Sequence, residues 1–373
     1  MQNDRSEHTQ GQGQGAGADL AGQALAVDLG GTKALLGLFA TDVGAAAPPR
    51  AMHVRRLACA DFAGFEALLS AYLDTARTER AIGRIESACI GLAGPVDGDR
   101  ARLTNLPWEI DAKRIAAMLA GARVRLVNDF AAAAAGIETL DGAALRAIQQ
   151  AVPRPGAPRL VLGAGTGLGT ALLIPCGSAW RVFPGEGGHA AFAPRDECEL
   201  GFWRHVSKDA GRVSWEHVVS GPGIEAIYAY LRDPGSRVDA STPARDRVSA
   251  ARISAVGLGQ ESAREPGRQP QSPAVDPGIA SAALDMFASA FGAFAGDAAL
   301  LTLPHGGIYI AGGIAAKVFD ARRTQLFLQS FGAKGVQSAL MSGFPVSLVA
   351  EPRVGLLGAA LLATRRDRDQ TSD

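Results

Sequence analysis

The chain lacks any excess of charge, since 37 lysines and arginines are balanced by 37 aspartates and glutamates. A nucleic-acid-binding domain usually shows a basic excess, so this balance argues against binding of nucleic acid by bulk charge. No uninterrupted apolar stretch reaches the ~20 residues that a membrane-spanning helix needs. We therefore expect a protein with neither nucleic-acid nor membrane partners.

Cysteine and histidine are scarce, with four and six residues respectively. The cysteines form no CxxC pair, and the histidines form no HxH or HxxxH cluster. This pattern argues against a structural zinc site and against a disulfide scaffold. Scattered thiols that stay reduced indicate a cytoplasmic protein, in which each cysteine serves as a small apolar residue.

A chain of 373 residues predicts two domains, because domains commonly run to ~100–200 residues. Residues 1–22 are rich in Gln and Gly and have no apolar core, so they are expected to form a disordered tail and no secretory signal. Between residues 233 and 278 the composition shifts to Arg, Ser, Pro, Gln and Gly. This low-complexity insertion predicts a surface excursion that is at least partly disordered.

Short apolar runs alternate with segments of helical spacing along the chain. The short runs predict buried strands at residues 24–29, 34–39, 87–92, 124–127, 160–162, 170–174, 307–311 and 346–349. Helical spacing predicts helices over residues 62–76, after a capping Asp111, over 283–301 and over 355–363. Strands that alternate with helices predict an α/β fold.

Two glycine turns, each between two apolar runs, are the most informative feature. The first comprises Val27, Asp28, Leu29, Gly30, Gly31 and Thr32, and the second includes Gly165, Thr166 and Gly167. A hairpin tip without side chains exposes backbone N–H groups that can approach a phosphate closely. Two such tips about a domain apart suggest two half-folds that close on one polyphosphate. A dinucleotide fingerprint at residues 163–168 is disfavoured, because a strand follows it where a helix is required, although Glu186 lies at a suitable distance.

Charged residues flank the first turn. Asp28 is suited to hold Mg²⁺ through a metal-bound water, or else to accept hydrogen bonds from the N–H groups of the turn. Lys33 either contacts a phosphate or is solvated. Asn128 and Asp129 end a predicted strand, where α/β proteins commonly place reactive groups. Asp129 could accept a proton from an attacking hydroxyl while Asn128 anchors a neighbouring one, or Asp129 could cap the following helix.

A loop of residues 184–189 is too rich in glycine to be core, and it carries Glu186 and His189 three residues apart. Carboxylate and imidazole groups can each bind the hydroxyls of a sugar. The alternative for His189 is a locally bonded turn residue. Glu216 follows Ser214, a candidate helix cap, and by itself is more typical of a solvated helix position.

Taken together and in this order, these segments resemble the bacterial glucokinase family of ATP-dependent hexokinases. The resemblance spans residues 24–363, and GAGTGLG followed closely by PGEGGH is its most specific part. The matching segments are VDLGGT (27–32), LTNLPW (103–108), VNDF (127–130), GAGTGLG (163–169), PGEGGH (184–189), SGPG (220–223), YIAGGI (309–314) and GLLGAA (355–360).

The resemblance implies a two-domain, actin-like (ribonuclease H-like) sugar-kinase fold with a repeated core and an interdomain cleft. It implies a small domain of residues 23–138 plus 352–373 and a large domain of residues 139–351. Asp129 corresponds to the catalytic base. The implied sugar-binding residues are Asn128, Asp129, Glu186, His189, Glu216 and Asn105. The implied nucleotide-binding residues are those of the two turns together with Gly312 and Gly313.

The activity implied is transfer of the γ-phosphoryl group of ATP, with Mg²⁺, to the 6-hydroxyl of D-glucose by a homodimer. Other hexoses such as fructose or an N-acetylhexosamine, and other donors such as polyphosphate or ADP, remain alternatives. A sugar-responsive regulatory protein without turnover is disfavoured because Asp129 and both turns are present. A DNA-binding repressor is disfavoured because the tail before Ala24 is too short for a helix-turn-helix. An actin- or chaperone-like ATPase would not need the loop of residues 184–189.

Overall fold

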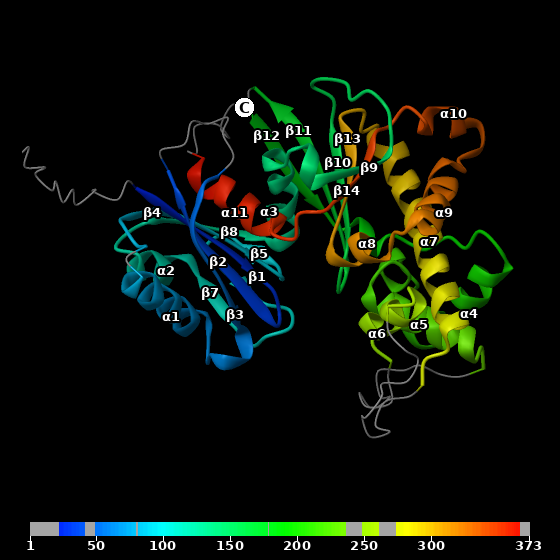
Figure 1. Cartoon of the computed structure of the whole chain (residues 1–373), viewed down its shortest axis with the longest axis horizontal. Helices are drawn as coiled ribbons and strands as arrows, with labels where there is room; N and C mark the ends of the chain where they lie inside the picture. Colours follow the sequence, from blue (N-terminus) through cyan, green and yellow to red (C-terminus); the bar gives the residue numbers. More distant parts are fainter. Residues whose placement is uncertain are drawn as a thin grey trace, which may run out of the picture.

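The computed structural model describes residues 22–41, 49–79, 81–177, 179–235, 248–260 and 274–365. The predicted disordered tail lies outside the described residues, apart from its last position, and so does most of the predicted insertion. The described residues form two lobes, each built around one β-sheet (Figure 1). The prediction of an α/β fold is confirmed.

The first sheet has the strand order β3-β2-β1-β4-β8. Its strands are β1 (Gln23–Leu29), β2 (Lys33–Ala40), β3 (Ala51–Ala58), β4 (Ile85–Leu92) and β8 (Arg123–Asn128). β1 pairs antiparallel with β2 and parallel with β4, which pairs parallel with β8. A small antiparallel sheet of β5 (Val96–Asp97), β6 (Arg100–Arg102) and β7 (Glu109–Asp111) lies outside it.

The second sheet has the order β12-β11-β10-β13-β14-β9. Its strands are β9 (Leu145–Gln149), β10 (Arg159–Ala164), β11 (Leu168–Cys176), β12 (Ala179–Gly185), β13 (Gly307–Ala311) and β14 (Val346–Val349). From β12 to β14 the pairing is antiparallel, antiparallel, parallel, parallel, which repeats the pairing from β3 to β8. The repeated core that the family resemblance implies is therefore present.

Helices cover both faces of each sheet. One face of the first sheet packs on α1 (Phe65–Thr78) and α2 (Ala112–Met118), and the other on α3 (Asp129–Gly136) and α11 (Val354–Thr364). As predicted, Asp111 caps α2, accepting a hydrogen bond from the backbone N–H of Lys113. α3 also packs on the second sheet, so it lies between the two lobes (Figure 1).

α3 and α11 cross with almost no side chains between them. A Cβ atom at Gly136 would lie 2.1 Å from the carbonyl oxygen of Val354, and one at Gly358 would lie 1.7 Å from that of Ala132. Only glycine fits at these two positions, because any side chain would overlap backbone of the partner helix. The last described helix is thereby joined to the first sheet, far from it in sequence.

The other face of the second sheet packs on a helical layer. This layer comprises α4 (Glu197–Ala210), α5 (Gly221–Arg232), α6 (Ala250–Gly257), α7 (Pro277–Thr302), α8 (Gly313–Val318), α9 (Ala321–Gly332) and α10 (Ser338–Met341). Short 3₁₀ turns lie at Cys59–Asp61, Ile137–Thr139, Gly142–Ala144, Gly187–His189, Trp215–His217 and Gly335–Gln337.

α7 is long and apolar enough to cross a membrane by length and composition, although it contains no uninterrupted apolar stretch of that length. Two charged residues interrupt its apolar run, which is why no continuous stretch was found in the sequence. Most of the helix is buried against α5, α6 and α9, as in the core helix of a globular lobe.

The expectation of a surface excursion over residues 233–278 is wrong for its described middle part. α6 lies within this stretch, and Ile253, Val256 and Val275 are buried in the core of the second lobe. The stretch is polar overall, but it contains the short amphipathic helix α6. The buried Arg323 of α9 donates to the carbonyl oxygen of Gly257, so α6 is tied to the helical layer.

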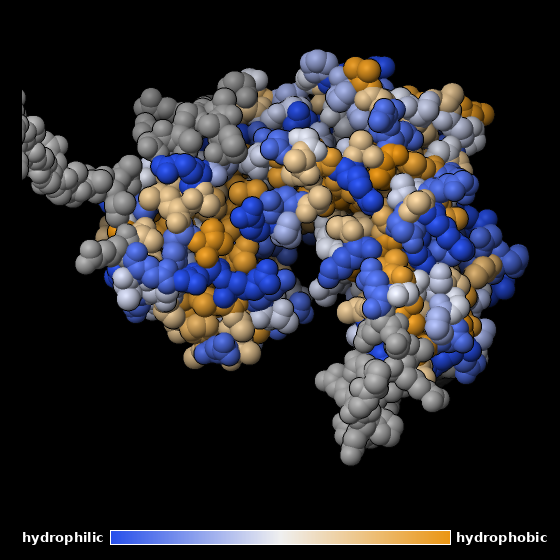
Figure 2. All heavy atoms as spheres, in the orientation of Figure 1, coloured by the Kyte–Doolittle hydropathy of each residue, from blue (hydrophilic) through white to orange (hydrophobic). Residues whose placement is uncertain are grey.

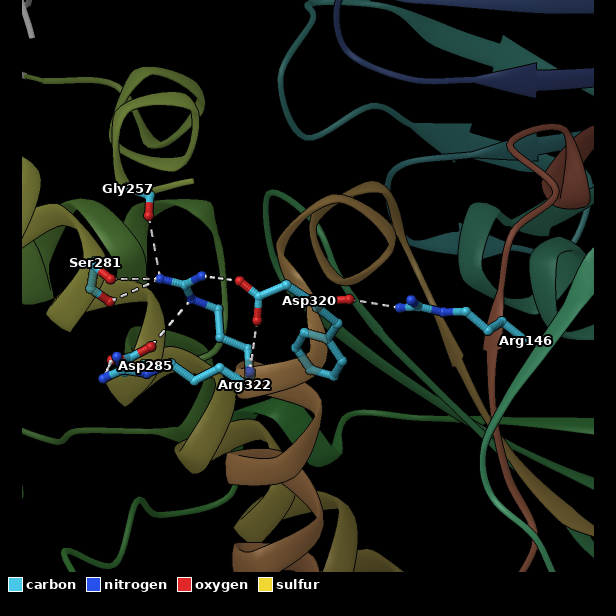
Figure 3. A network of polar contacts seen from close by, with 8 residues as sticks. Arg146, Gly257, Ser281, Asp285, Asp320 and Arg322 are labelled. Carbon is cyan, nitrogen blue, oxygen red and sulfur yellow. Dashed lines mark hydrogen bonds and ion pairs between the residues drawn. The ribbon is translucent and has the colours of Figure 1, made fainter. Parts of the chain in front are cut away.

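The same guanidinium binds α7 as well as α6. It donates to the hydroxyl of Ser281 at 2.8 Å, and its Nε lies 3.3 Å from a carboxylate oxygen of Asp285. Asp320, which caps α9, accepts from another of its nitrogens. Figure 3 shows this network, in which one buried arginine joins three helices.

The cysteine prediction is only partly confirmed. Cys59 and Cys89 are buried, Cys176 is half-buried and Cys198 is exposed. All four are free thiols.

Candidate active site

The two predicted turns are hairpin tips at matching places in the two sheets. The first joins β1 to β2 and the second joins β10 to β11. Both hairpins are antiparallel, which excludes the dinucleotide fingerprint, since that motif opens a helix after its strand. On the surface, the molecule is hollowed between the two lobes (Figure 2).

Asp129 is the first residue of α3, directly after the carboxyl end of β8. The N-cap is Asn128, whose Oδ1 accepts from the N–H groups of Phe130 at 2.9 Å and Ala131 at 3.3 Å. The capping role considered for Asp129 therefore belongs mainly to its neighbour. Because the cap occupies Oδ1, Asn128 would meet a substrate hydroxyl with its Nδ2 donors.

The carboxylate of Asp129 accepts from the backbone N–H of Phe130 at 2.7 Å. Burial raises the pKa of Asp129, and its backbone hydrogen bonds oppose that change. A carboxylate of raised basicity is better suited to accept a proton than an ordinary one. Gly91 of β4 lets α3 approach the first sheet closely, because a Cβ at Gly91 would lie 2.9 Å from Cβ of Ala132 in α3.

Asp28 lies near the carboxyl end of β1, at the same edge of the sheet as Asp129. Burial, and then the negative charge of Asp129, raise the pKa of Asp28 to about 6, while the charge of Lys33 lowers it. A Cβ at Gly355 would lie 2.9 Å from Oδ2 of Asp28, so this carboxylate faces the first turn of α11. Two acids thus share one partly desolvated site, where a cation would relieve their repulsion.

The first turn is closed by a hydrogen bond from the N–H of Gly30 to the carbonyl oxygen of Lys33, at 3.0 Å. Val27 and Leu29 are fully buried, so only their backbone can serve a ligand, whereas Thr32 is exposed. Asn105 lies over the turn, since a Cβ at Gly31 would come within 2.9 Å of its Cβ.

The second turn is held from two sides. The N–H of Gly165 donates to the carbonyl oxygen of Gly167 at 2.8 Å, and the carbonyl oxygen of Gly165 accepts from the N–H of Gly221 in α5 at 2.8 Å. Glu216 accepts from the N–H of Leu168 at 2.8 Å. The predicted sugar-binding Glu216 is therefore in contact with the predicted phosphate turn, and it is not a solvated helix residue.

The loop of residues 184–189 lies beside the start of β11. The Nε2 of His189 lies 3.8 Å from Oε2 of Glu186, and both side chains are exposed, at 62% and 91%. Thr170 fixes the loop, because its hydroxyl donates to the carbonyl oxygen of Gly185 at 2.8 Å and accepts from the N–H of Gly187 at 3.1 Å. Thr170 was not among the predicted site residues, since its position three residues after Gly167 carries no sequence signal of this role.

Gly312 and Gly313 follow β13 and lie beside the second turn. Gly312 has a φ of 90°, and a Cβ there would lie 2.4 Å from the carbonyl oxygen of Ala164, the last residue of β10. Only glycine fits here. A Cβ built on Gly313 would meet no other group of the described chain within 4 Å, which leaves room for a ligand.

Two lobes with the same strand pairing, each with a glycine-turn hairpin at the corresponding place, define the class of two-domain, actin-like sugar kinases. The model of the glucokinase family matches residues 25–366. The chain is 39% identical to a glucokinase of Nostoc punctiforme over 91% of this chain and 98% of that protein. The chain belongs to the glucokinase family.

Solved structures agree with this assignment. A glucokinase from an Antarctic psychrotroph is 27% identical, with a TM-score of 0.73 over 91% of this chain and 98% of that one. A ROK-family glucokinase from Streptomyces griseus, solved with glucose and AMPPNP, shares the fold at 20% identity, with a TM-score of 0.55 over 91% of this chain and 99% of that one.

Proposed function

We propose that the chain transfers the γ-phosphoryl group of ATP to the 6-hydroxyl of D-glucose, giving glucose 6-phosphate and ADP. The observation that carries the proposal is the position of Asp129. It is a partly desolvated carboxylate of raised pKa at the start of α3, the helix between the two lobes. The family relationship identifies glucose as the acceptor.

Asp129 accepts the proton of the 6-hydroxyl and orients its oxygen for in-line attack. In phosphoryl transfer the transition state is loose, so the base mainly positions the nucleophile and takes its proton late. Asn128, Asn105, Glu186, His189 and Glu216 bind the remaining hydroxyls. Closure of the lobes on glucose excludes water, which would otherwise compete as the acceptor.

ATP binds with its phosphates between the two glycine turns and its adenosine at Gly312 and Gly313. Mg²⁺ would accompany the phosphates and neutralise their charge, and Asp28 is the residue that would hold it, through a water molecule. Mg²⁺ typically uses one or two protein carboxylates together with waters and phosphate oxygens. The residues fit this pattern, because Asp28 is a partly desolvated carboxylate close enough to Asp129 for its charge to be felt, and a cation would relieve the repulsion between the two.

The family resemblance supports a homodimer, and four free thiols are compatible with action in the reducing cytoplasm. Light scattering after size-exclusion chromatography measures the molar mass, and hence the subunit number, directly. A purely monomeric protein at working concentration would contradict the dimer.

The test of function is a coupled glucose-phosphorylation assay, repeated with fructose and N-acetylhexosamines and with polyphosphate or ADP as donors. In Asp129→Asn, kcat falls by about 10²–10⁴-fold, the range for loss of a general base, while glucose binding stays within a few-fold. Asp97→Asn, an exposed site on β5, is the control. A near-normal kcat in Asp129→Asn would show that Asp129 is not the catalytic base. Faster turnover of another hexose would show that this hexose, and not glucose, is the preferred acceptor.

A further inference from the structure

Two glycines of the second hairpin make space for one aromatic ring. Gly163 on β10 and Gly169 on β11 lie opposite each other in the strand register. A Cβ at Gly163 would lie 2.4 Å from the ring of Phe130, and a Cβ at Gly169 would lie 2.5 Å from the same ring. The ring of Phe130 therefore occupies the space in which side chains of both strands would otherwise stand.

These glycines stand at the base of the second turn. Gly163 lies two residues before Gly165, and Gly169 lies two residues after Gly167. They were part of a single glycine-rich motif in the sequence, but they serve a different purpose from the tip. The tip has bare N–H groups to offer to phosphate, whereas the pair below it receives a side chain from another element.

The ring belongs to the residue that follows Asp129. The backbone N–H of Phe130 donates to Oδ1 of Asp129 at 2.7 Å and to Oδ1 of Asn128 at 2.9 Å. The position of Phe130 therefore determines where both neighbouring polar side chains are held. The rest of α3 and the 3₁₀ turn after it pack on the same hairpin through Ala134 and Ile137, which lie in one apolar cluster with Val161 and Ala171.

We infer that Phe130 is a positioning residue that fixes the carboxylate of Asp129 relative to the second glycine turn. This inference rests on the proposed function, in which Asp129 is the base and the turn holds phosphate. Asp129 follows a strand of the first sheet, yet through Phe130 it is held against the hairpin of the second sheet. The contact with the second hairpin thus adds to the packing of α3 on the first sheet, so Asp129 is fixed from both lobes.

Two single variants disturb this contact in opposite ways. Phe130→Ala removes the ring, and Gly169→Ala places a methyl group where the ring lies. Each displaces Asp129 from its position for proton transfer, and small misplacement of a catalytic group costs up to about 100-fold in rate. We expect kcat to fall at least about tenfold and KM for glucose to change by a smaller factor, because several other side chains share the binding of glucose whereas Asp129 alone serves as the base.

The matched control is Phe331→Ala, on α9 in the helical layer of the second lobe. Phe331 is fully buried and stacks on Phe327 in that layer, so its truncation lowers the melting temperature at least as much as that of Phe130, while α9 carries none of the proposed site residues. With assays run well below the melting temperature of each variant, Phe331→Ala retains the wild-type kcat. A role of Phe130 in stability alone would make the two variants behave alike.

The double variant Phe130→Ala/Gly169→Ala provides a second criterion. Without the ring, the added methyl group has nothing to displace, so the double variant keeps the kcat of Phe130→Ala. Such non-additivity is expected only for groups in direct contact. Fully multiplicative losses, or a rise in KM with kcat unchanged in Phe130→Ala, would overturn the inference.

Wild-type turnover of glucose, measured first, tests the proposed function separately. If the wild type phosphorylates glucose and Asp129→Asn does not, the proposed function stands whatever the Phe130 variants do. If Phe130→Ala fails to fold, Gly169→Ala alone still tests the contact, since a wild-type kcat in that variant would contradict it. Glucose binding, followed by tryptophan fluorescence, is expected to change by a smaller factor than kcat in Phe130→Ala and Gly169→Ala.

Discussion

Asp28 gives a prediction about stability that is independent of turnover. Its folded-state pKa is raised from 3.8 to about 6, first by burial and then by the charge of Asp129. Between these two values the unfolded chain has released the proton while the folded chain retains it. The contribution of Asp28 to the free energy of unfolding therefore decreases as the pH rises from about 4 to about 6, and this contribution is constant at higher pH.

The size of this effect follows from the pKa shift. A shift of roughly two units at about 1.4 kcal/mol per unit makes the ionised Asp28 destabilising by about 3 kcal/mol above pH 7. Replacement by Asn removes the charge and the effect with it. Asp28→Asn is expected to raise the free energy of unfolding by about 3 kcal/mol at about pH 7.5, and by less than 1 kcal/mol at about pH 4.

Urea denaturation without nucleotide, followed by tryptophan fluorescence at both pH values, measures this difference. Asp97→Asn is the control, because it is the same change at an exposed position in the same lobe, and we expect no pH-dependent gain there. A gain in Asp28→Asn that is equal at the two pH values would refute the reasoning, since it would not come from ionisation. A loss at about pH 7.5 would mean that the carboxylate is stabilising.

Three further predictions concern neighbouring parts of the fold. Thr170→Val removes both hydrogen bonds that hold the loop of residues 184–189, so KM for glucose rises about tenfold while kcat changes little, as steady-state assays will measure. Gly312→Ala forces a side chain against the carbonyl oxygen of Ala164 at a φ of 90°, so it lowers stability by about 1–3 kcal/mol and weakens ATP binding, measurable by calorimetry. Arg323→Met removes the buried guanidinium that binds Asp320, Ser281 and the carbonyl oxygen of Gly257, and it leaves the exposed Arg322 as the partner of Asp285, so the free energy of unfolding falls by about 3 kcal/mol while kcat at low temperature is kept. An unchanged KM in Thr170→Val would contradict the first prediction, and an unchanged affinity for ATP in Gly312→Ala the second. An unchanged denaturation midpoint in Arg323→Met would contradict the third.

Much of the fold could be predicted from the sequence, because its signals are local. Both hairpins were predicted from apolar runs on either side of a glycine turn, and all eight predicted strands are present. α7 was predicted from its apolar spacing, and the cap at Asp111 from residue type. α6 was missed because two polar stretches surround a short amphipathic segment, and only its tertiary packing shows that it is core.

The site was predicted less completely, because its contacts join residues that are distant in sequence. That Glu186 and His189 lie together follows from their spacing. That Glu216 accepts from the N–H of Leu168 does not, since the two are 48 residues apart. The raised pKa of Asp28 likewise depends on burial and on Asp129, neither of which a turn motif reveals. The catalytic and binding roles of the site residues stay predictions until the variants are measured.

The crossing of α3 and α11 also constrains the order in which the chain can fold during synthesis. The inner face of the first sheet, including Ala24 and Ala26, is covered by α11, which is translated only after the whole second sheet. A ribosome-bound chain thus carries a nearly complete first lobe with one apolar sheet face that only α3 covers until residues 354–364 emerge. That interval is when a chaperone would be most useful to this protein, because an uncovered sheet face can associate with other nascent chains.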